Sequence, residues 1–227
     1  VKIVSPRVNP NDPVVLDWIK SWFTMKNKKG LNTRCIHDGE LKDDKFKGAV
    51  SPLYLSTAYD YLEVVDHKYP RYFNTPNQLA LSKKISSLEN CEKSLIFGSG
   101  IAAIFASMFS FLKTGDHVVF QSSLYGGTIN LILKEFKKFN IEHTLVESLE
   151  IEDYKKEIKS NTKLIYIETP SNPLLQLIDL KAVSDLAKNN NLISIIDNTF
   201  ASPINQNPSD FGIDIIVHSA TKYLGGH

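Results

Sequence analysis

The sequence predicts an α/β fold built on a mainly parallel sheet. From residue 94 onward, short apolar runs alternate with segments of helical periodicity, which is the pattern of repeated βα units. With 227 residues, the chain is long enough to bury a substantial core in one large domain. We therefore expect a doubly wound core, with helices on both faces of the sheet.

Six strands and four intervening helices are expected in this core. The apolar runs predict strands at residues 94–97, 117–120, 143–146, 163–168, 192–197 and 213–218. Helical segments are expected at residues 101–112, 126–139, 151–158 and 179–190. In the last segment, apolar residues recur between Leu180 and Ala187 at the spacing of one helix face. Open α/β sheets bind ligands outside the carboxyl ends of their strands, so the residues that follow each strand are the first site candidates.

The residues before the core show little sustained periodicity. A helix is expected at 77–88, just ahead of the first strand. Residues 26–76 contain scattered polar residues, prolines and tyrosines, which favours an extended arm. Residues 1–25 are interpreted as an upstream extension, with Met25 as the natural start. The expected organisation is therefore an extension at 1–25, an arm at 26–76 and a core domain at 77–227.

Composition and charge exclude several function classes. With 26 basic and 25 acidic residues, the chain has no electrostatic footprint for nucleic acid or an anionic membrane. No apolar stretch approaches the roughly 18 residues that span a bilayer. Cys35 and Cys91 lack the CxxC spacing of a metal site and do not form a disulfide framework, which favours a reducing cytoplasm. Small-molecule chemistry without a metal is therefore expected.

Lys222 follows the apolar run that is expected to form the last strand. It lies in the segment Ser219-Ala220-Thr221-Lys222, with two hydroxyl groups before it and two glycines shortly after it. An amine on the loop after a buried strand can hold an aldehyde cofactor as a Schiff base. Lys222 is therefore the first candidate for a catalytic residue.

Two further strand ends carry groups that suit such a cofactor. The turn from Gly98 to Ile101 opens a helix and can offer free backbone N–H groups to a phosphate. Glycines serve an ordinary tight turn equally well, and the spacing is not that of a Walker loop or a dinucleotide fingerprint. Asp197 closes a buried strand and needs a partner, such as a protonated pyridine nitrogen. A helix cap or a loop ion pair is the alternative for Asp197.

Aromatic and amide side chains follow other strands. The ring of Tyr125 can stack on a planar cofactor and its phenol can shuttle a proton, or the residue can be a packing group. Asn172 can reach a phenolic oxygen or serve a Pro-rich turn. In the arm, Arg71 beside Tyr69 suits a phosphate oxyanion or a solvated cation–π contact. In combination, these groups match the needs of pyridoxal phosphate: a covalent anchor, a carboxylate for the ring nitrogen, a stacking ring and a phosphate clamp.

This set of residues resembles the Cys/Met-metabolism family of pyridoxal-phosphate enzymes. The family is the transsulfuration group, with cystathionine γ-synthase, cystathionine lyases, homoserine-ester sulfhydrylases and methionine γ-lyase. The resemblance covers about residues 31–227, and the run from Val217 to His227 carries it most specifically. It implies the large domain of fold type I, as in aspartate aminotransferase, with the family's C-terminal small domain absent after residue 227.

The resemblance also implies roles for single residues of the core. Lys222 would form the Schiff base, Asp197 would pair with the pyridinium nitrogen, and Tyr125 would stack on the ring. Asn172 would lie near the ring hydroxyl. The phosphate would be held by four residues: Gly100, Ile101, Ser219 and Thr221. In catalysis, Lys222 would remove the α-proton of a bound amino acid, and Lys222 with Tyr125 would serve a β-proton transfer.

In the arm, Tyr69 and Arg71 would reach the phosphate of a neighbouring subunit, so the protein would be a homo-oligomer, a dimer of dimers with shared active sites. Two positions depart from the family pattern. Asn74-Thr75-Pro76 stands where the family has Asn-Pro-Thr. Gly127 stands where methionine γ-lyases carry a cysteine, which disfavours that activity.

The resemblance implies an enzyme that makes or breaks a C–S or C–O bond in a small amino acid of the cysteine–homocysteine pathway. A γ-synthase or a cystathionine lyase is preferred over an O-acetylhomoserine sulfhydrylase or a methionine γ-lyase. Two interpretations outside this class stay open. One is an inactive fragment that acts only as an association module, which the complete cofactor set disfavours. The other is a nucleotide-binding domain, which the missing phosphate-loop motif disfavours.

Overall fold

The computed structural model describes residues 29–226 of the chain. The expected upstream extension at residues 1–25 lies outside the described residues. The chain divides into two compact units, with the boundary between Ser94 and Leu95. The core domain expected from the sequence begins at residue 77. Because the boundary between the two units lies at residue 94, the helix expected at 77–88 belongs to the first unit.

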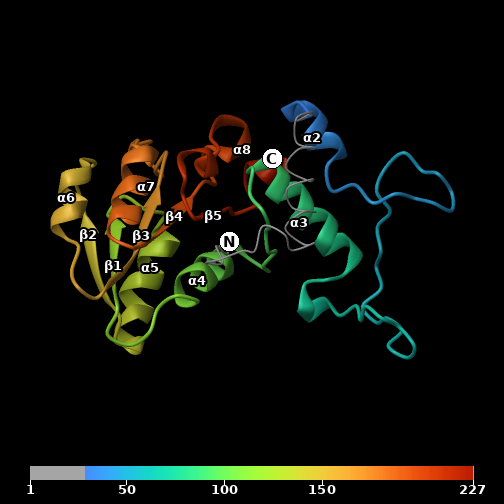
Figure 1. Ribbon diagram of the computed structural model, residues 1–227, viewed down its shortest axis with the longest axis horizontal. Helices are drawn as coiled ribbons and strands as arrows, with labels where there is room; N and C mark the ends of the chain where they lie inside the picture. The colour runs from blue at the N-terminus through green and yellow to red at the C-terminus, as the bar shows by residue number, and fades with distance from the viewer. Residues whose placement is uncertain (1–28, 227) are drawn as a thin grey trace, which may run out of the picture. The chain divides into compact units, whose positions relative to one another are not determined.

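The second unit contains a five-stranded parallel sheet (Figure 1). Its strands are β1 (His117–Gln121), β2 (Glu142–Val146), β3 (Thr162–Glu168), β4 (Ile193–Asp197) and β5 (Ile215–Val217). They lie in the order β2-β1-β3-β4-β5, and every neighbouring pair is parallel. The predicted α/β fold class is confirmed, and with it five of the six expected strands.

The strand expected at residues 94–97 does not form, so this prediction was wrong. These residues have no strand assignment, and within the described chain no strand of the sheet pairs with them. Leu95 is 60% exposed, and the Ser94 hydroxyl donates to the Ser82 carbonyl at 2.7 Å. An apolar run becomes a strand only where a neighbouring strand completes its hydrogen bonds, and local sequence does not reveal that neighbour.

Helices cover both faces of the sheet (Figure 1). They are α4 (Gly100–Phe109), α5 (Gly126–Glu135), α6 (Ile151–Lys156), α7 (Leu180–Asn189) and the short α8 (Ser202–Asn205), with 3-10 turns η3 (Phe136–Phe139), η4 (Pro208–Phe211) and η5 (Tyr223–Gly225). The chain runs outward from β1 to β2 through α5, then returns through α6 to β3. Because crossovers are right-handed, this reversal puts α5 and α6 on opposite faces. The reversal lies between β1 and β3, where such sheets bind ligands.

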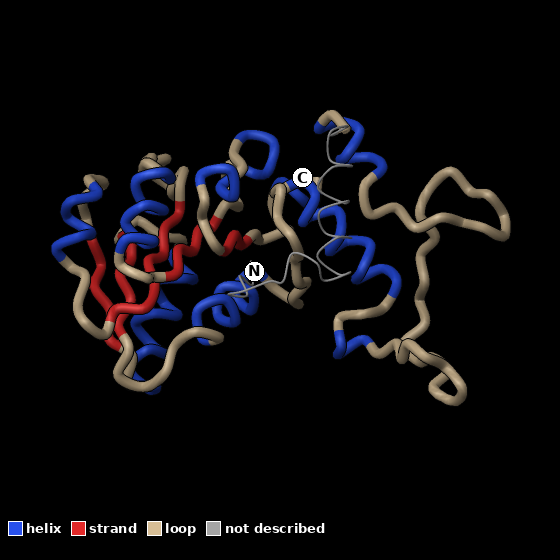
Figure 2. Tube along the Cα trace, in the orientation of Figure 1, coloured by secondary structure: helices blue, strands red, loops and turns tan. Residues whose placement is uncertain are grey.

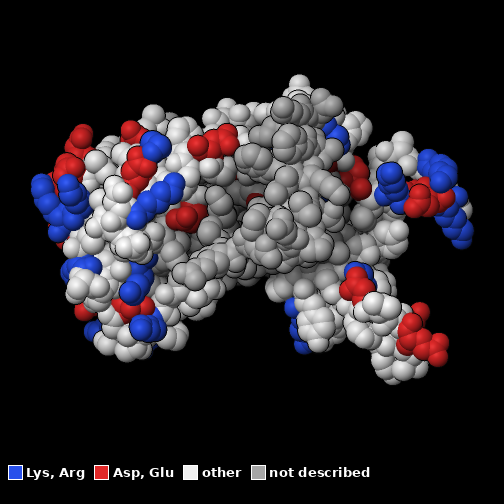
Figure 3. All heavy atoms as spheres, in the orientation of Figure 1, with Lys and Arg blue, Asp and Glu red and all other residues white. Residues whose placement is uncertain are grey.

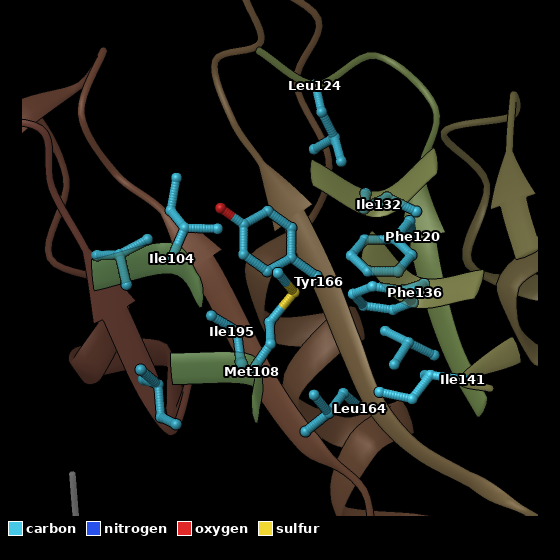
Figure 4. Close-up of a cluster of buried hydrophobic side chains, with 13 residues drawn as sticks. Ile104, Met108, Phe120, Leu124, Ile132, Phe136, Ile141, Leu164, Tyr166 and Ile195 are labelled. Atoms are coloured by element: carbon cyan, nitrogen blue, oxygen red, sulfur yellow. The ribbon is translucent and has the colours of Figure 1, made fainter. Parts of the chain in front are cut away.

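Side chains alternate between two apolar layers along each strand. On β3, Tyr166 belongs to the layer under α4 and α5, whereas Ile165 and Ile167 belong to the layer under α6 and α7. Figure 4 shows the Tyr166 ring at the centre of the first layer, with Phe120 and Phe136 to one side. The ring centroids of Phe120 and Tyr166 are 5.7 Å apart. Because both faces are covered, the central strands are apolar almost throughout, as the sequence indicated.

The first unit contains α2 (Leu31–His37), η2 (Pro70–Tyr72) and α3 (Pro76–Leu88). Residues 38–69 carry neither helix nor strand, as Figure 2 shows. The sequence predicted α3 but not α2. Lys84 of α3 donates to the carbonyls of Cys35 and Ile36 at 3.0 and 3.1 Å, which satisfies backbone groups at the end of α2. Contacts with α3 therefore stabilise a helix that the local sequence does not announce.

Charged side chains of both signs are mixed on the sheet unit. Short Lys–acid pairs lie along α6 and α7: Lys155–Glu152, Lys156–Asp153 and Lys181–Asp185. Figure 3 shows basic and acidic side chains interspersed on the visible face. Among residues 29–226, no helix is long and apolar enough to cross a membrane, and no three metal-binding side chains gather in one place.

His117 gives the fold a measurable pH dependence. Its fully buried ring lies 2.8 Å from the Thr162 hydroxyl and 3.0 Å from the Thr144 hydroxyl. Burial, with a smaller contribution from the nearby Lys159 charge, lowers the pKa of His117 from 6.5 to about 4. Between these two values the unfolded chain binds more protons than the folded chain. We therefore expect stability to fall as the pH falls through this window, by about 2 kcal/mol at about pH 5.

Urea unfolding gives the free energy of unfolding of the native protein and of His117→Gln at neutral pH and at about pH 5. The loss of stability between the two pH values should be larger for the native protein than for the variant. Other titrating groups, which are present in both proteins, then cancel. The exposed His37→Gln variant is the matched control and should keep the native pH dependence. A stability difference between His117→Gln and the native protein that does not change with pH would contradict the prediction.

Candidate active site

The carboxyl ends of the central strands and the loop after β5 surround a cavity of about 670 Å³. Every site residue that the sequence predicted in this unit lines it: Gly100, Ile101, Tyr125, Asn172, Asp197, Ser219, Thr221 and Lys222. These residues come from positions far apart in the chain. The parallel sheet brings them together because all five strands end at the same edge.

The start of α4 forms one wall of the cavity. Ser99 caps the helix, and its hydroxyl accepts the N–H of Ala102 at 3.1 Å. Within the described chain, the N–H groups of Gly100 and Ile101 donate to no protein acceptor. Such groups, together with the positive end of the helix dipole, favour an anion.

Gly100 allows the loop after β5 to approach the start of α4. A Cβ atom at this position would lie only 2.9 Å from the Cβ of Ser219. Ser219 and Thr221 also line the cavity. The start of α4 and the Ser219 hydroxyl therefore lie close together at the cavity, which suits a phosphate group.

Asp197 is the last residue of β4 and is only 6% exposed. It accepts the N–H of Thr199 at 3.0 Å, and the Thr199 hydroxyl accepts the N–H of Ser219 at 2.8 Å. Burial raises the pKa of the Asp197 carboxyl, against the bonds from Thr199 and the charges of His218 and Lys222. Thr199 thus holds Asp197 and the β5 loop in one arrangement, and the carboxyl lies where a cationic ring nitrogen would compensate its burial.

Lys222 and Tyr125 face each other at the cavity. The Lys222 amine lies 6.0 Å from the centroid of the Tyr125 ring. Tyr125 is the residue just before α5 and is 44% exposed. An amine and a phenol on one cavity can each carry a proton to or from a bound molecule.

Gly127 leaves room for the Tyr125 ring. A Cβ atom at Gly127 would lie 2.4 Å from Cε1 of Tyr125, whereas a Cβ at the adjacent Gly126 would meet nothing within 4 Å. We expect Gly127→Ala to displace the ring and to weaken pyridoxal phosphate binding about tenfold, the loss of roughly one stacking contact. Gly126→Ala, in the same helix turn, is the matched control. Fluorescence titration measures both affinities, and equal affinities of the two variants would contradict the prediction.

Glu168 is a site residue to which the sequence interpretation gave no role. It ends β3, lines the cavity and is 4% exposed. Its carboxyl accepts the N–H of Tyr125 at 2.7 Å and the N–H of Asn172 at 3.1 Å. Burial raises the pKa of Glu168 to about 7, with the Asp197 charge adding to this and the two N–H groups opposing it. The sequence contained a signal for Glu168, because it is a carboxyl residue at the end of an apolar strand, as Asp197 is.

Other lining residues were also missed. They are neighbours of the predicted ones or apolar wall residues: Ser99, Ile104, Thr199, Phe200 and Tyr223. Thr199 could have been found, because it follows the same strand end as Asp197. The apolar residues carry no local signal, because an isoleucine or phenylalanine is most often a core residue.

Tyr69 and Arg71 lie in the first unit, around η2. The Arg71 guanidinium lies 4.9 Å from the centroid of the Tyr69 ring, so the cation–π contact that was the local alternative is present. Tyr69 also packs edge-on against Tyr72, with 5.1 Å between ring centroids. The unusual Thr75-Pro76 sequence starts α3: Thr75 and Gln78 form a capping box, and Pro76 takes the first helical position.

Comparison with known proteins gives a consistent result. The model of the family described as "Cys/Met metabolism PLP-dependent enzyme" matches residues 32–227. L-methionine gamma-lyase of Fusobacterium nucleatum subsp. nucleatum is 40% identical over 88% of this chain and 53% of its own length. Cystathionine gamma-lyase of Bacillus subtilis is 44% identical over 86% of this chain and 52% of its own length.

Solved structures show the same likeness. The crystal structure of metB from Corynebacterium glutamicum superposes with a TM-score of 0.84 at 38% identity, over 88% of this chain and 53% of that one. Cystathionine gamma-lyase from Lactobacillus plantarum, complexed with L-serine, gives 0.83 at 38% identity, over 88% and 52%. The chain spans about half the length of the curated relatives it matches.

Proposed function

The chain belongs to the Cys/Met metabolism PLP-dependent enzyme family, and on this basis we propose that the protein makes or breaks the carbon–sulfur bond of an amino acid in the cysteine–homocysteine pathway. One observation carries the proposal. Lys222, Asp197, Tyr125 and the first residues of α4 line a single cavity.

The cavity fits pyridoxal phosphate. Its volume of about 670 Å³ lies within the range of small-molecule sites. The phosphate would be held by Gly100, Ile101, Ser219 and Thr221. Asp197 would bind the ring nitrogen, Tyr125 the ring face, Asn172 the ring hydroxyl and Lys222 the aldehyde carbon. When bound, the cofactor supplies an electron-withdrawing ring that stabilises negative charge at the α-carbon of an amino acid.

The chain's own residues would bind and orient the cofactor and the substrate, and would move protons. Lys222 Nζ would take the proton from the α-carbon of the substrate, and Tyr125, whose ring centroid lies 6.0 Å from this amine, would carry a second proton. Asp197 would hold a negative charge at the ring nitrogen and so favour the protonated ring. Ile101, Ile104 and Phe200 provide apolar wall, which limits water at the reacting atoms.

Within the family, a cystathionine γ-synthase or cystathionine lyase is preferred over an O-acetylhomoserine sulfhydrylase or a methionine γ-lyase. The glycine at position 127 disfavours the methionine γ-lyase, because the ring of Tyr125 occupies the space that a side chain there would need. The test is the consumption of four substrates by the full-length, cofactor-loaded protein: L-cystathionine, an O-acylhomoserine with cysteine, an O-acylhomoserine with sulfide, and L-methionine. Turnover of none of them would refute the proposal.

We further propose that the protein is a cytoplasmic homo-oligomer, a dimer of dimers whose arm at 26–76 brings Tyr69 and Arg71 to the phosphate site of a neighbouring subunit. Large apolar side chains of the arm support an interface of this kind, since they are strongly exposed in the single chain: Phe46, Val50, Leu53, Leu55, Leu62 and Val65. Cys35 and Cys91 lack the spacing of a disulfide framework, which supports a reducing compartment. Sedimentation of the full-length protein measures the number of chains.

A further inference from the structure

Two buried carboxyl groups lie side by side at the floor of the cavity. Glu168 of β3 pairs in register with Asp197 of β4, and both line the cavity. Two residues earlier on each strand, Tyr166 and Ile195 face the layer under α4 and α5. Because side chains alternate along a strand, the two carboxyl groups point to this same face.

Glu168 connects the loops that follow β1 and β3. One carboxyl oxygen accepts the N–H of Tyr125 and the other accepts the N–H of Asn172. The backbone of Glu168 is itself fixed, because its N–H donates to the buried side chain of Gln121 on β1 at 3.1 Å. A single rigidly held side chain therefore sets where two cavity loops lie relative to the sheet.

The two carboxyl groups have different partners. Asp197 has the bonds from Thr199 and the opposite charges of His218 and Lys222. Glu168 has its two N–H groups and faces a like charge on Asp197. The Glu168 charge also acts on the buried phenol of Tyr166, whose pKa it helps to raise. The Asp197 charge therefore opposes ionisation of Glu168 and adds to the effect of burial.

We propose that Glu168 is a positioning residue, which holds the backbone of Tyr125 and of Asn172 at the cavity through the two hydrogen bonds that its carboxylate accepts. The proposal rests on the proposed function only for what Tyr125 and Asn172 do to the cofactor. Ionised Glu168 accepts both bonds fully, whereas protonated Glu168 accepts at one oxygen weakly. Burial raises the pKa of Glu168 to about 7. The two hydrogen bonds that Glu168 accepts therefore become stronger as the pH rises through neutrality and the carboxyl ionises.

Amide hydrogen exchange of the full-length protein without added cofactor tests directly whether Glu168 holds the two backbone segments in place. The Glu168→Gln variant keeps the size of the side chain, retains one acceptor oxygen and cannot ionise. We expect at least one of the segments 122–128 and 169–176 to exchange about tenfold faster in this variant, as for the loss of one hydrogen bond. After correction for intrinsic rates, native protection of both segments should rise from about pH 6 to about pH 8, and the variant should lose this rise.

Asp179→Asn is the matched control. Asp179 also accepts two backbone N–H groups, those of Lys181 and Ala182 at 2.8 and 3.1 Å, but at the start of α7 and outside the residues that line the cavity. The Asp179→Asn variant should speed hydrogen exchange only near residues 180–183. Unchanged exchange of both cavity segments in Glu168→Gln, or an equal increase throughout β1 and β3, would overturn the proposal, since the latter shows general destabilisation.

Pyridoxal phosphate affinity gives a second measurement. We expect Glu168→Gln to bind the cofactor about tenfold more weakly, with altered visible circular dichroism, because the ring of Tyr125 is no longer held. Unaltered affinity and dichroism would show that Glu168 does not position the site. If the native protein binds no cofactor while the exchange result holds, the proposed function fails and the hold on the two loops stands.

Discussion

Replacement of Lys222 by alanine should abolish covalent attachment of pyridoxal phosphate and lower turnover at least ~10³-fold. The Lys222 amine lies in the cavity with Asp197, Tyr125 and the start of α4, and it would serve both as the anchor and as the base. Alanine removes both roles and adds no bulk. Borohydride reduction followed by mass spectrometry locates the attachment, and steady-state kinetics of the full-length enzyme measure the turnover.

The control for Lys222→Ala is Lys134→Ala, which removes an exposed lysine of α5 and should leave labelling and turnover unchanged. The assignment is refuted if the label lies on another lysine or if Lys222→Ala retains full activity. The same experiment separates an enzyme from an association module. A module would show no mass attached at Lys222 after reduction.

Asp197→Asn should lower kcat roughly 10²–10³-fold with little loss of folding stability. An amide keeps the size of the side chain and can still accept the N–H of Thr199, which bonds Oδ1 in the structure. It cannot keep a negative charge beside a protonated ring nitrogen. Since burial raises the pKa of Asp197, the ionised carboxyl is costly to the folded chain, and its removal should not lower the melting temperature of the cofactor-free protein.

Steady-state kinetics and thermal unfolding of the same preparations measure the two effects of Asp197→Asn. Asp185→Asn is the matched control, since Asp185 forms a surface ion pair with Lys181 on α7 and such pairs contribute little. Native kcat in Asp197→Asn would contradict the assigned role. A large fall in the melting temperature would instead indicate that the carboxylate mainly stabilises the fold.

Much of the sheet could be predicted from the sequence alone. Four of the strands, β1, β3, β4 and β5, are largely apolar runs between polar turns, and burial on both faces gives such a run a local sequence signal. The α7 helix has its apolar stripe and an N-cap, Asp179, which accepts two backbone N–H groups. These signals are local, so a single sequence contains them.

The candidate site was predictable for a related reason. Asp197 ends a strand, and Lys222, Tyr125 and Asn172 each follow one, and parallel strands that share a sheet end at one edge. Strand ends can be read along the chain, so the convergence of these residues on one cavity was expected and was found. The part assigned to each residue in binding the cofactor stays a prediction that the variants above test.

The sequence by itself therefore determined the fold class, the order of the core elements and the residues at the strand ends. The tertiary structure decided the rest: residues 94–97 form no strand, α2 forms against α3, Gly127 makes space for a ring, and Glu168 ties together two loops. Each of these depends on a contact with residues distant in sequence or on the direction of a side chain. Periodicity and spacing report only how a segment divides its surface between core and solvent, so they do not identify the partner that it meets.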